Sequence, residues 1–170
     1  RLVEQLLQLA RLDAEATPDR SSTPLAEVAR HVAADLQATA ERRQQRIVLR
    51  EPMAPGMHIP LPEPLARVLL RNLLDNALRY SPEGAEVQLQ INEQSDGHAQ
   101  LSVEDSGPGL TPEEQARLGE RFFRVLGTGQ SGSGLGWSII QRIARLHHLQ
   151  VGTDTSSGLG GLRVTVRWKP

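Results

Sequence analysis

Two carboxamide side chains four positions apart are the first residues whose type and spacing could do chemistry. Asn72 and Asn76 lie late in residues 61–80, where the apolar spacing predicts one helix. Residues four apart project from the same side of a helix, so the two amides form a polar pair on a mostly apolar helix. Buried polar groups without partners cost free energy. The stretch alone leaves two interpretations open, a helix cap or core hydrogen-bond pair on one side and a ligand site on the other.

Two glycine-rich segments downstream favour a ligand site. Asp105-x-Gly107-x-Gly109 ends a predicted strand, where glycines allow close backbone approach and a buried carboxylate can accept a hydrogen bond from an amine. Residues 132–136, Gly-Ser-Gly-Leu-Gly, open a predicted helix, where free backbone amides and the helix dipole favour phosphate. Each pattern is weak alone, but the three in this order and spacing are a strong signal.

Alternation and helical spacing predict the elements that must position these residues. The order of the elements, with the late strands antiparallel, predicts an α+β fold: a two-layer α/β sandwich whose mixed, mostly antiparallel sheet is covered by helices on one face. Thr23 is the expected cap of the first helix of the domain, and Thr111 with Glu114 the expected cap of the short one. The predicted helices are 24–43, 61–80, 111–119 and 134–146, and the predicted strands are 46–50, 57–59, 86–92, 99–104, 147–154 and 162–168.

Composition excludes several classes of function. The 170 residues carry a net charge of -1, which offers no electrostatic reason for nucleic-acid binding. The absence of cysteine excludes disulfides, thiolate catalysis and cysteine-based zinc sites. No apolar run approaches the ~20 residues that span a bilayer. The chain begins at Arg1 without Met, inside a helical pattern, so we expect a fragment of a longer protein that is itself soluble.

The first residues predict a helix with a wide apolar stripe. A short isolated helix could not keep such a stripe in water, so it needs a partner helix or its own domain to pack on. Three segments are therefore predicted: a helical stub at 1–16, a turn-rich linker at 17–22 and a domain at 23–170.

With these motifs in hand, the chain resembles the ATP-binding catalytic domain of sensor histidine kinases, in the gyrase, heat-shock chaperone, histidine kinase and MutL superfamily with its Bergerat-type fold. The likeness covers about residues 25–170. The opening residues resemble the end of a dimerisation helix, particularly in QseC- or PmrB-like kinases. The family's boxes match four stretches: Asn72 to Tyr80 (N box), Asp105 to Gly109 (G1 box), Arg121 to Arg124 (F box) and Gly132 to Gly136 (G2 box).

The resemblance implies Mg²⁺ and ATP as ligands. Asn76 would be the direct metal ligand, with Asn72 supporting the metal or its waters. Magnesium prefers oxygen donors, keeps several waters and shares substrate phosphates, so one or two carboxamide oxygens suffice. Arg124 would contact the γ-phosphate, with an ordinary surface arginine as the alternative interpretation.

The resemblance also implies how the rest of the nucleotide is held. Asp105 would accept from the adenine amine, partly through water, beside Tyr80. Phe122 and Phe123 would pack in a lid formed by residues 125–133, and Trp137 would pack under the sheet or shield that lid. The remaining implied contacts are Gly107 and Gly109 at the base and lid hinge, Arg79 at phosphate, and Gly132, Gly134, Leu135 and Gly136 as phosphate-binding backbone.

One position bears on the type of reaction. Hydrolytic members of the superfamily carry Glu four residues before the metal asparagine, whereas Asn72, which stands there, cannot act as a general base. We therefore expect ATP binding with little intrinsic hydrolysis, and transfer of the γ-phosphate to a histidine. None of the five histidines stands in the family's phosphoacceptor setting. The fragment is expected to lack that histidine.

The expected partners follow from the resemblance: the protein's own dimerisation and phosphoacceptor domain in a homodimer, and a response regulator. The expected location is the cytoplasmic side of a bacterial inner-membrane protein. Two alternatives remain, a hydrolytic ATPase of the same superfamily and a nucleotide-binding interaction module without transfer activity. P-loop and protein-kinase assignments fail because GxxxxGK[ST], HRD and DFG are absent. A Rossmann assignment fails on glycine spacing.

Overall fold

The structure, a computed structural model, describes residues 7, 10, 21–50, 56–118 and 135–170. Its main sheet has the strand order β2-β4-β5-β7-β6, with β2 parallel to β4 and the remaining neighbours antiparallel. A two-residue ladder pairs β1 with β3. The strands are β1 (Thr23–Pro24), β2 (Arg46–Arg50), β3 (His58–Ile59), β4 (Glu86–Glu93), β5 (Ala99–Asp105), β6 (Gln150–Thr155) and β7 (Leu162–Trp168).

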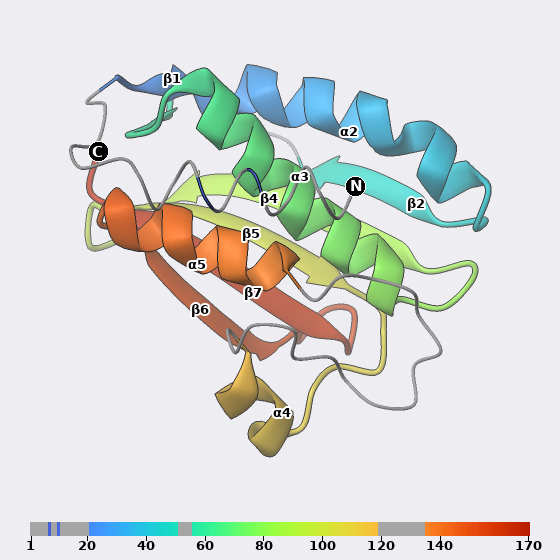
Figure 1. Cartoon of the computed structure of the whole chain (residues 1–170). Helices are drawn as coiled ribbons and strands as arrows, with labels where there is room; N and C mark the ends of the chain where they lie inside the picture. Colours follow the sequence, from blue (N-terminus) through green and yellow to red (C-terminus); the bar gives the residue numbers. More distant parts are fainter. Residues whose placement is uncertain (1–6, 8–9, 11–20, 51–55, 119–134) are drawn as a thin grey trace.

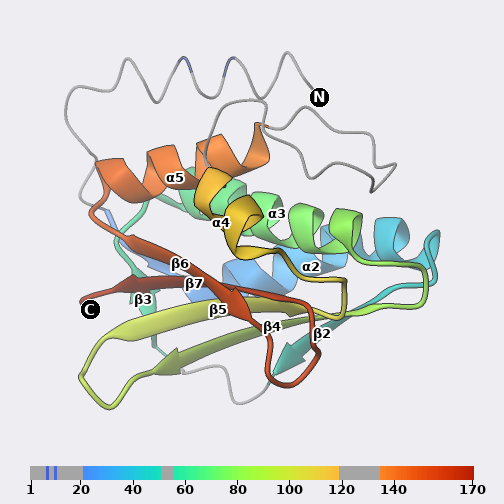
Figure 2. The same cartoon turned by 90° about the horizontal axis from the view of Figure 1, so that it is seen from below.

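Three helices lie on one face of this sheet, and the other face carries none of the described helices (Figures 1 and 2). The predicted two-layer sandwich with a mixed sheet is confirmed. A short fourth helix, α4, stands beside the layers rather than on the sheet (Figure 1). The helices are α2 (Leu25–Glu41), α3 (Glu63–Tyr80), α4 (Pro112–Arg117) and α5 (Gly136–Leu146).

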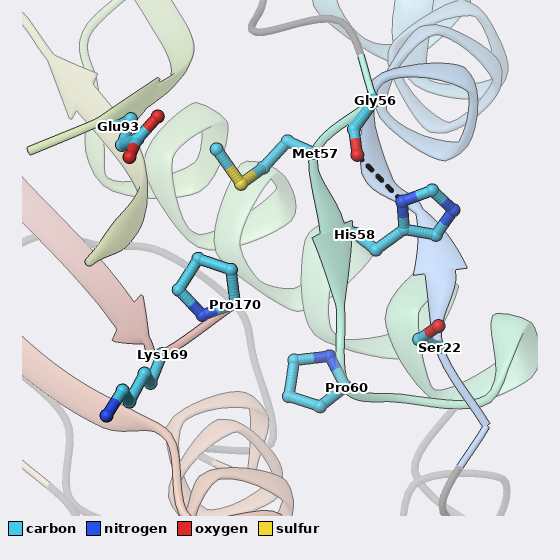
Figure 3. A pocket seen from close by; sticks show the side chains of 8 residues that line it. All are labelled: Ser22, Gly56, Met57, His58, Pro60, Glu93, Lys169 and Pro170. Carbon is cyan, nitrogen blue, oxygen red and sulfur yellow. Dashed lines mark hydrogen bonds between the residues drawn. The ribbon is translucent and has the colours of Figure 1, made fainter. Parts of the chain in front are cut away.

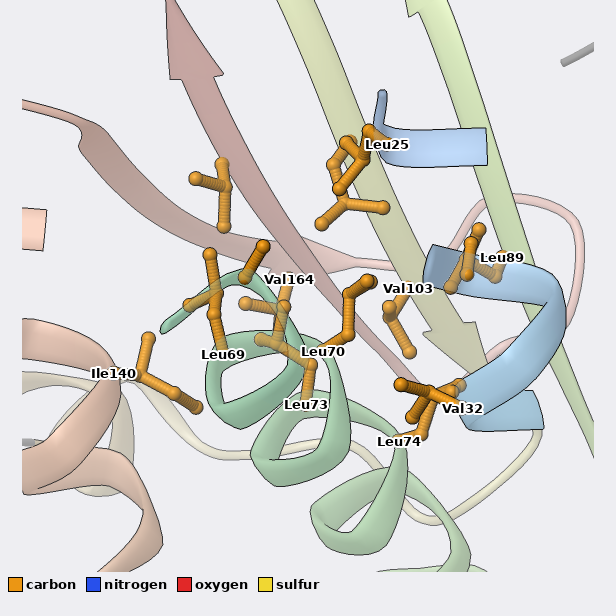
Figure 4. Close-up of a cluster of buried hydrophobic side chains, with 14 of the residues drawn as sticks. Leu25, Val32, Leu69, Leu70, Leu73, Leu74, Leu89, Val103, Ile140 and Val164 are labelled. Atoms are coloured by element: carbon orange, nitrogen blue, oxygen red, sulfur yellow. The ribbon is translucent and has the colours of Figure 1, made fainter. Parts of the chain in front are cut away.

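The strand register explains why one face of the sheet is apolar. Leu89, Val103 and Val164 are direct neighbours across β4, β5 and β7, and Ile91, Leu101 and Val166 form the next row. Period-two alternation places both rows on the same face, where all six side chains are buried. Helix α3 covers them with a leucine-rich side that includes Leu69, Leu70, Leu73 and Leu74 (Figure 4).

Most predicted elements form within a few residues of their expected ends. Thr111 and Glu114 make the predicted capping box at α4. The last helix ends at Leu146, and His148 has a φ of 55°, so β6 begins later than predicted.

The predicted helix cap at Thr23 is wrong. Thr23 lies in β1, where it pairs with Ile59, and Pro24 occupies the cap position of α2. The Thr23 hydroxyl donates to the Leu61 carbonyl at 2.7 Å. The long-range bond between two chain segments replaces the local cap that the sequence favoured.

The predicted N-terminal stub and linker lie mostly outside the part of the chain that the structure describes. The predicted stub at 1–16 and most of the linker at 17–22 fall among residues that are not described, apart from Leu7, Ala10, Ser21 and Ser22. None of the described helices is both long and apolar enough to cross a membrane.

The end of α3 is held by two side chains that precede β2. Arg43 donates from Nη1 to the Leu78 carbonyl at 2.6 Å and from Nη2 to the Ser81 carbonyl at 3.3 Å. Gln45 is buried, and its Nε2 lies 2.9 Å from the carbonyl oxygens of Leu78, Ser81 and Pro82. The last carbonyls of a helix lack intrahelical partners, so these donors replace water there.

Replacing Gln45 with alanine should therefore destabilise the domain. We expect Gln45→Ala to lower the free energy of unfolding by about 1–3 kcal/mol, the cost of leaving buried acceptors without a donor. Urea unfolding of the purified chain measures it. The matched control is Gln37→Ala, whose side chain is exposed on α2 and bonds only Glu41 within the described residues. Equal destabilisation by the two changes would contradict the assigned role of Gln45.

Candidate functional site

The two asparagines of α3 face the first turn of α5. Asn72 donates from Nδ2 to the Val68 carbonyl at 2.8 Å, one turn earlier, which turns its Oδ1 away from its own helix. A Cβ placed on Gly136 would lie 3.0 Å from Asn76 Oδ1 and 3.1 Å from Asn72 Oδ1. Both carboxamide oxygens therefore lie at the N-terminus of α5, next to a residue with no side chain. The predicted association of the asparagine pair with Gly136 is present in the fold.

This placement depends on helix packing rather than on local sequence. Helices α3 and α5 lie side by side on the sheet (Figure 1). Leu135, which precedes α5, is 1% exposed, and Ile139, Ile140 and Ile143 are buried on the same helix. Burial of this apolar side sets the rotation of α5 and brings its first residue to Asn72 and Asn76.

Asp105 is a buried carboxylate at the end of β5. The residue is 5% exposed, and Oδ1 accepts backbone N–H bonds from Gly107 at 2.9 Å and Leu162 at 3.2 Å. Burial raises the pKa of Asp105 above its ordinary value of 3.8, and the hydrogen bonds from Gly107 and then Leu162 oppose that rise. Within the described residues both side-chain bonds use Oδ1, so Oδ2 remains available as an acceptor.

Glycines let three backbone segments meet around this carboxylate. A Cβ on Gly107 would lie 2.8 Å from Asp105 Oδ1 and 3.1 Å from the Tyr80 carbonyl oxygen. Gly109 adopts a φ of 71° and would place its Cβ 3.7 Å from the Gly161 backbone. The end of α3, the loop after β5 and the turn before β7 thus converge at Asp105, with the Tyr80 carbonyl beside Gly107. The position of the Tyr80 ring beside adenine stays a prediction.

Gly161 is a residue of this site that sequence reasoning missed. A Cβ on Gly161 would overlap the carbonyl oxygen and Oδ1 of Asp105 and lie 2.6 Å from the Gly107 nitrogen. The Gly161 N–H donates to the Asp105 carbonyl at 3.1 Å. The signal that the sequence offers is the glycine pair Gly160-Gly161 just before the predicted strand 162–168.

Arg79 and Tyr80 lie at the end of α3, as expected, but Arg79 already has a partner. Its Nη2 lies 2.9 Å from Asp75 Oδ2, and both side chains are 19% exposed. This i,i+4 ion pair would have to open or share its charge for Arg79 to contact a phosphate. The phosphate role of Arg79 stays a prediction.

Several predicted site residues lie outside the described part of the chain. They are Arg124, Gly132 and Gly134, together with the phenylalanines at 122 and 123 and the expected lid at 125–133. Trp137 is half-buried and packs against the core.

The described residues form a two-ended site. At one end lies a buried carboxylate with a free oxygen; at the other lie two carboxamide oxygens beside a helix N-terminus. The last turn of α3 connects the ends, because the Tyr80 carbonyl lies beside Gly107 and Asn76 lies one turn earlier. Such an arrangement suits a ligand with a hydrogen-bond donor at one end and metal-bound anionic groups at the other. No cluster of three or more His, Asp or Glu that could hold a metal occurs within the described residues.

A separate hollow of about 460 Å³ lies at the opposite end of the sheet (Figure 3). Met57, His58 and Glu93 are among its lining residues, and none of the predicted site residues takes part. Glu93 ends β4 and Lys169 follows β7, whereas Asp105 ends the antiparallel β5. Strand direction therefore separates this hollow from the candidate site by the length of the sheet.

Comparison with known proteins first defines the class. The profile of the Histidine kinase-, DNA gyrase B-, and HSP90-like ATPase family matches residues 62–170. This range contains both ends of the site. The chain therefore belongs to the histidine kinase-, DNA gyrase B- and HSP90-like ATPase family.

The relatives within that family are sensor histidine kinases. The chain is 41% identical over 171 residues to the sensor protein QseC of Escherichia coli strain K12, covering 99% of this chain and 36% of that protein. It is similar to the structure of the cytoplasmic segment of histidine kinase QseC, with a TM-score of 0.65, 31% identity, and coverage of 99% of this chain and 90% of that one.

The full-length structure of ShkA in complex with AMPPNP is also similar. Its TM-score is 0.80 at 28% identity, covering 98% of this chain and 34% of that one. The predicted family, including the QseC-like subfamily, is confirmed, and the chain corresponds to the ATP-binding part of these kinases. It spans about a third of the length of the curated relatives it matches.

The buried state of Asp105 predicts how stability depends on pH. A raised pKa means that the folded protein holds the proton more tightly than the unfolded chain, so Asp105 contributes stability below pH 3.8 that is lost as pH rises through its folded pKa. We expect Asp105→Asn to be more stable than wild type at pH 7, with a gain that shrinks as pH falls towards 4. Urea unfolding across this pH range measures the trend.

Asp96→Asn is the control of opposite sign. The N–H of His98 is the main cause that lowers the pKa of the exposed Asp96. Asp96→Asn should therefore be less stable than wild type at neutral pH, and this difference in stability should disappear in acid. A gain from Asp105→Asn that does not vary with pH would contradict the burial argument.

The close approach of Asp105 and Gly107 to Gly161 predicts that a side chain at position 161 destabilises the domain. Gly161→Ala should lower the free energy of unfolding by about 1–3 kcal/mol, because its Cβ meets backbone atoms that cannot rotate away. Gly158→Ala is the control in the same turn, since nothing lies within 4 Å of its Cβ position. Thermal or urea unfolding of both variants measures the difference, and equal stability of the two would exclude the predicted overlap.

Proposed function

We propose that this chain is the catalytic domain of a sensor histidine kinase that binds Mg–ATP and donates the γ-phosphoryl group to a histidine of its own dimerisation domain. The observation that carries the proposal is the convergence of the Asn72 and Asn76 oxygens on Gly136 at the start of α5. Oxygen donors for a metal and free amides for phosphate are thereby placed together.

The residues fit a magnesium ion shared with phosphates. Asn76 would ligate it directly and Asn72 would hold it or its waters, since Asn72 Nδ2 is already committed to the Val68 carbonyl and only its oxygen faces Gly136. When bound, magnesium neutralises the charge that develops during phosphoryl transfer. The contribution of the protein is to hold the phosphates in line with the acceptor.

Asp105 would bind the adenine end of ATP. The exocyclic amine donates to a carboxylate, and Oδ2 is the oxygen that the described residues leave without a hydrogen bond. Gly107, Gly109 and Gly161 allow the flat base to approach backbone. Arg79, Arg124, Gly132, Gly134 and the lid at 125–133 complete the proposed site.

Asn72 supports transfer rather than hydrolysis. A carboxamide has no basic oxygen to activate water, so the domain should hold ATP until a histidine is presented. That histidine would come from the dimerisation helix whose end is expected at residues 1–16, in a homodimer. A response regulator would then receive the phosphoryl group, on the cytoplasmic side of a membrane protein.

Nucleotide titration tests the site. We expect ATP affinity to rise when Mg²⁺ is added to the wild-type chain. We expect Asn76→Ala to lower this Mg²⁺-dependent affinity about tenfold or more, because the metal loses its ligand. Calorimetric titration with and without Mg²⁺ measures it. Asn92→Ala, on β4 at the other end of the sheet, is the matched control.

Two outcomes would overturn the proposal. Unchanged Mg²⁺-dependent affinity in Asn76→Ala would remove the metal assignment. Steady release of inorganic phosphate by the wild-type chain would favour the hydrolytic alternative.

A further inference from the structure

Asp105 is held in part by the turn that joins β6 to β7. Gly161 donates to its backbone carbonyl at 3.1 Å, and Leu162 donates to its Oδ1 at 3.2 Å. The other side-chain bond among the described residues comes from Gly107, two residues away along the chain. The direction in which Oδ2 points therefore depends on the shape of a turn that is more than 50 residues away in sequence.

A single buried serine organises that turn. Ser156 is 1% exposed, and its hydroxyl accepts from the Leu159 N–H at 3.0 Å. Its N–H donates to the Gly161 carbonyl at 2.8 Å, and its carbonyl accepts from Gly160 at 2.8 Å. The hydroxyl and the backbone of Ser156 together close the turn onto Gly161.

The same hydroxyl ties the turn to the strand that carries Asp105. Ser156 Oγ donates to Glu104 Oε2 at 2.5 Å. Glu104 is the residue immediately before Asp105 on β5, so its side chain leaves the opposite face of the sheet. The turn is thus held on both faces of β5, by Asp105 on the site face and by Glu104 on the outer face.

Arg163 completes this outer attachment. It is the direct neighbour of Glu104 between β5 and β7, and its Nε lies 3.0 Å from Glu104 Oε1. Its Nη2 donates to Glu104 Oε2 at 3.3 Å. The carboxylate accepts from both Arg163 and Ser156, which holds Glu104 in one orientation; its side chain is 14% exposed.

We infer that Ser156, together with Glu104 and Arg163, positions Asp105 for recognition of the adenine amino group. The inference rests on the proposed function, because it concerns the carboxylate oxygen assigned to that amine. Ser156 does not touch the nucleotide; it acts through the turn, whose Gly161 and Leu162 N–H groups set the orientation of Asp105.

The test isolates the amino group of the base. ATP and purine riboside triphosphate differ by that group, so the ratio of their affinities for one protein measures its recognition. Because only ATP can donate a hydrogen bond from this group to the charged acceptor, we expect wild type to bind ATP about tenfold more tightly than purine riboside triphosphate. In Ser156→Ala the ratio should fall towards about threefold or less, with the affinity for purine riboside triphosphate unchanged. Calorimetric titration of the 170-residue chain in Mg²⁺ supplies both constants.

Matched variants separate positioning from simple loss of stability. Gly158→Ala changes an exposed residue of the same turn whose Cβ would meet nothing within 4 Å, and it should keep the wild-type ratio. Ser156→Thr keeps the hydroxyl and should restore most of the preference. Glu104→Gln keeps an acceptor for Ser156 but weakens the attachment to Arg163, and should give an intermediate ratio even where Ser156→Ala folds poorly.

The outcomes distinguish this inference from the proposed function. If wild type binds neither nucleotide, or both equally, the assignment of Asp105 to the adenine amine fails. If wild type prefers ATP but Ser156→Ala and Glu104→Gln keep that preference, the inference alone is overturned. Equal weakening of both nucleotides in these variants would likewise assign them a purely structural role.

Discussion

Burial of the Asp105 carboxylate is the constraint on which the geometry of this site depends. A charged group removed from water must find hydrogen-bond donors within the protein, or its charge becomes unfavourable. The donors here are the N–H groups of Gly107 and Leu162, which belong to the following loop and a distant strand. Both segments must come close, and glycines at 107 and 161 remove the side chains that would prevent it.

Helix α3 connects this carboxylate to the other end of the site. Its leucines cover the apolar face of the sheet (Figure 4). That packing leaves Asn72 and Asn76 on the side that meets α5. Its last turn places the Tyr80 carbonyl beside Gly107 and is held by Arg43 and Gln45. One helix therefore sets both the position of the proposed metal ligands and one wall of the proposed base pocket.

The outer face of the sheet contributes to the site without touching it. Glu104 and Arg163 form a partly exposed ion pair there, and ion pairs at a protein surface add little to stability by themselves. Their contribution is to fix the position of the β6–β7 turn, because Glu104 also accepts a hydrogen bond from Ser156 and so ties this turn to β5. A polar cluster on one face of a strand can in this way orient a carboxylate on the other.

Local sequence determined much of this protein. Alternation in β4 and β5, leucine spacing in α3 and the Thr111–Glu114 cap are short-range patterns, and each formed as expected. The motif residues Asn76, Asp105 and Gly136 could be named because chemistry restricts their types at that spacing.

Tertiary structure alone decided the remainder. Thr23 bonded Leu61 instead of capping α2, and Gly161 and Ser156 joined the site from the far end of the chain. Each of these depends on a partner chosen by packing, and hydrogen-bond partners distant in sequence leave no periodic pattern along the chain. The residue types that do the chemistry are visible in sequence, whereas the groups that hold them in place are set by which strands and helices become neighbours.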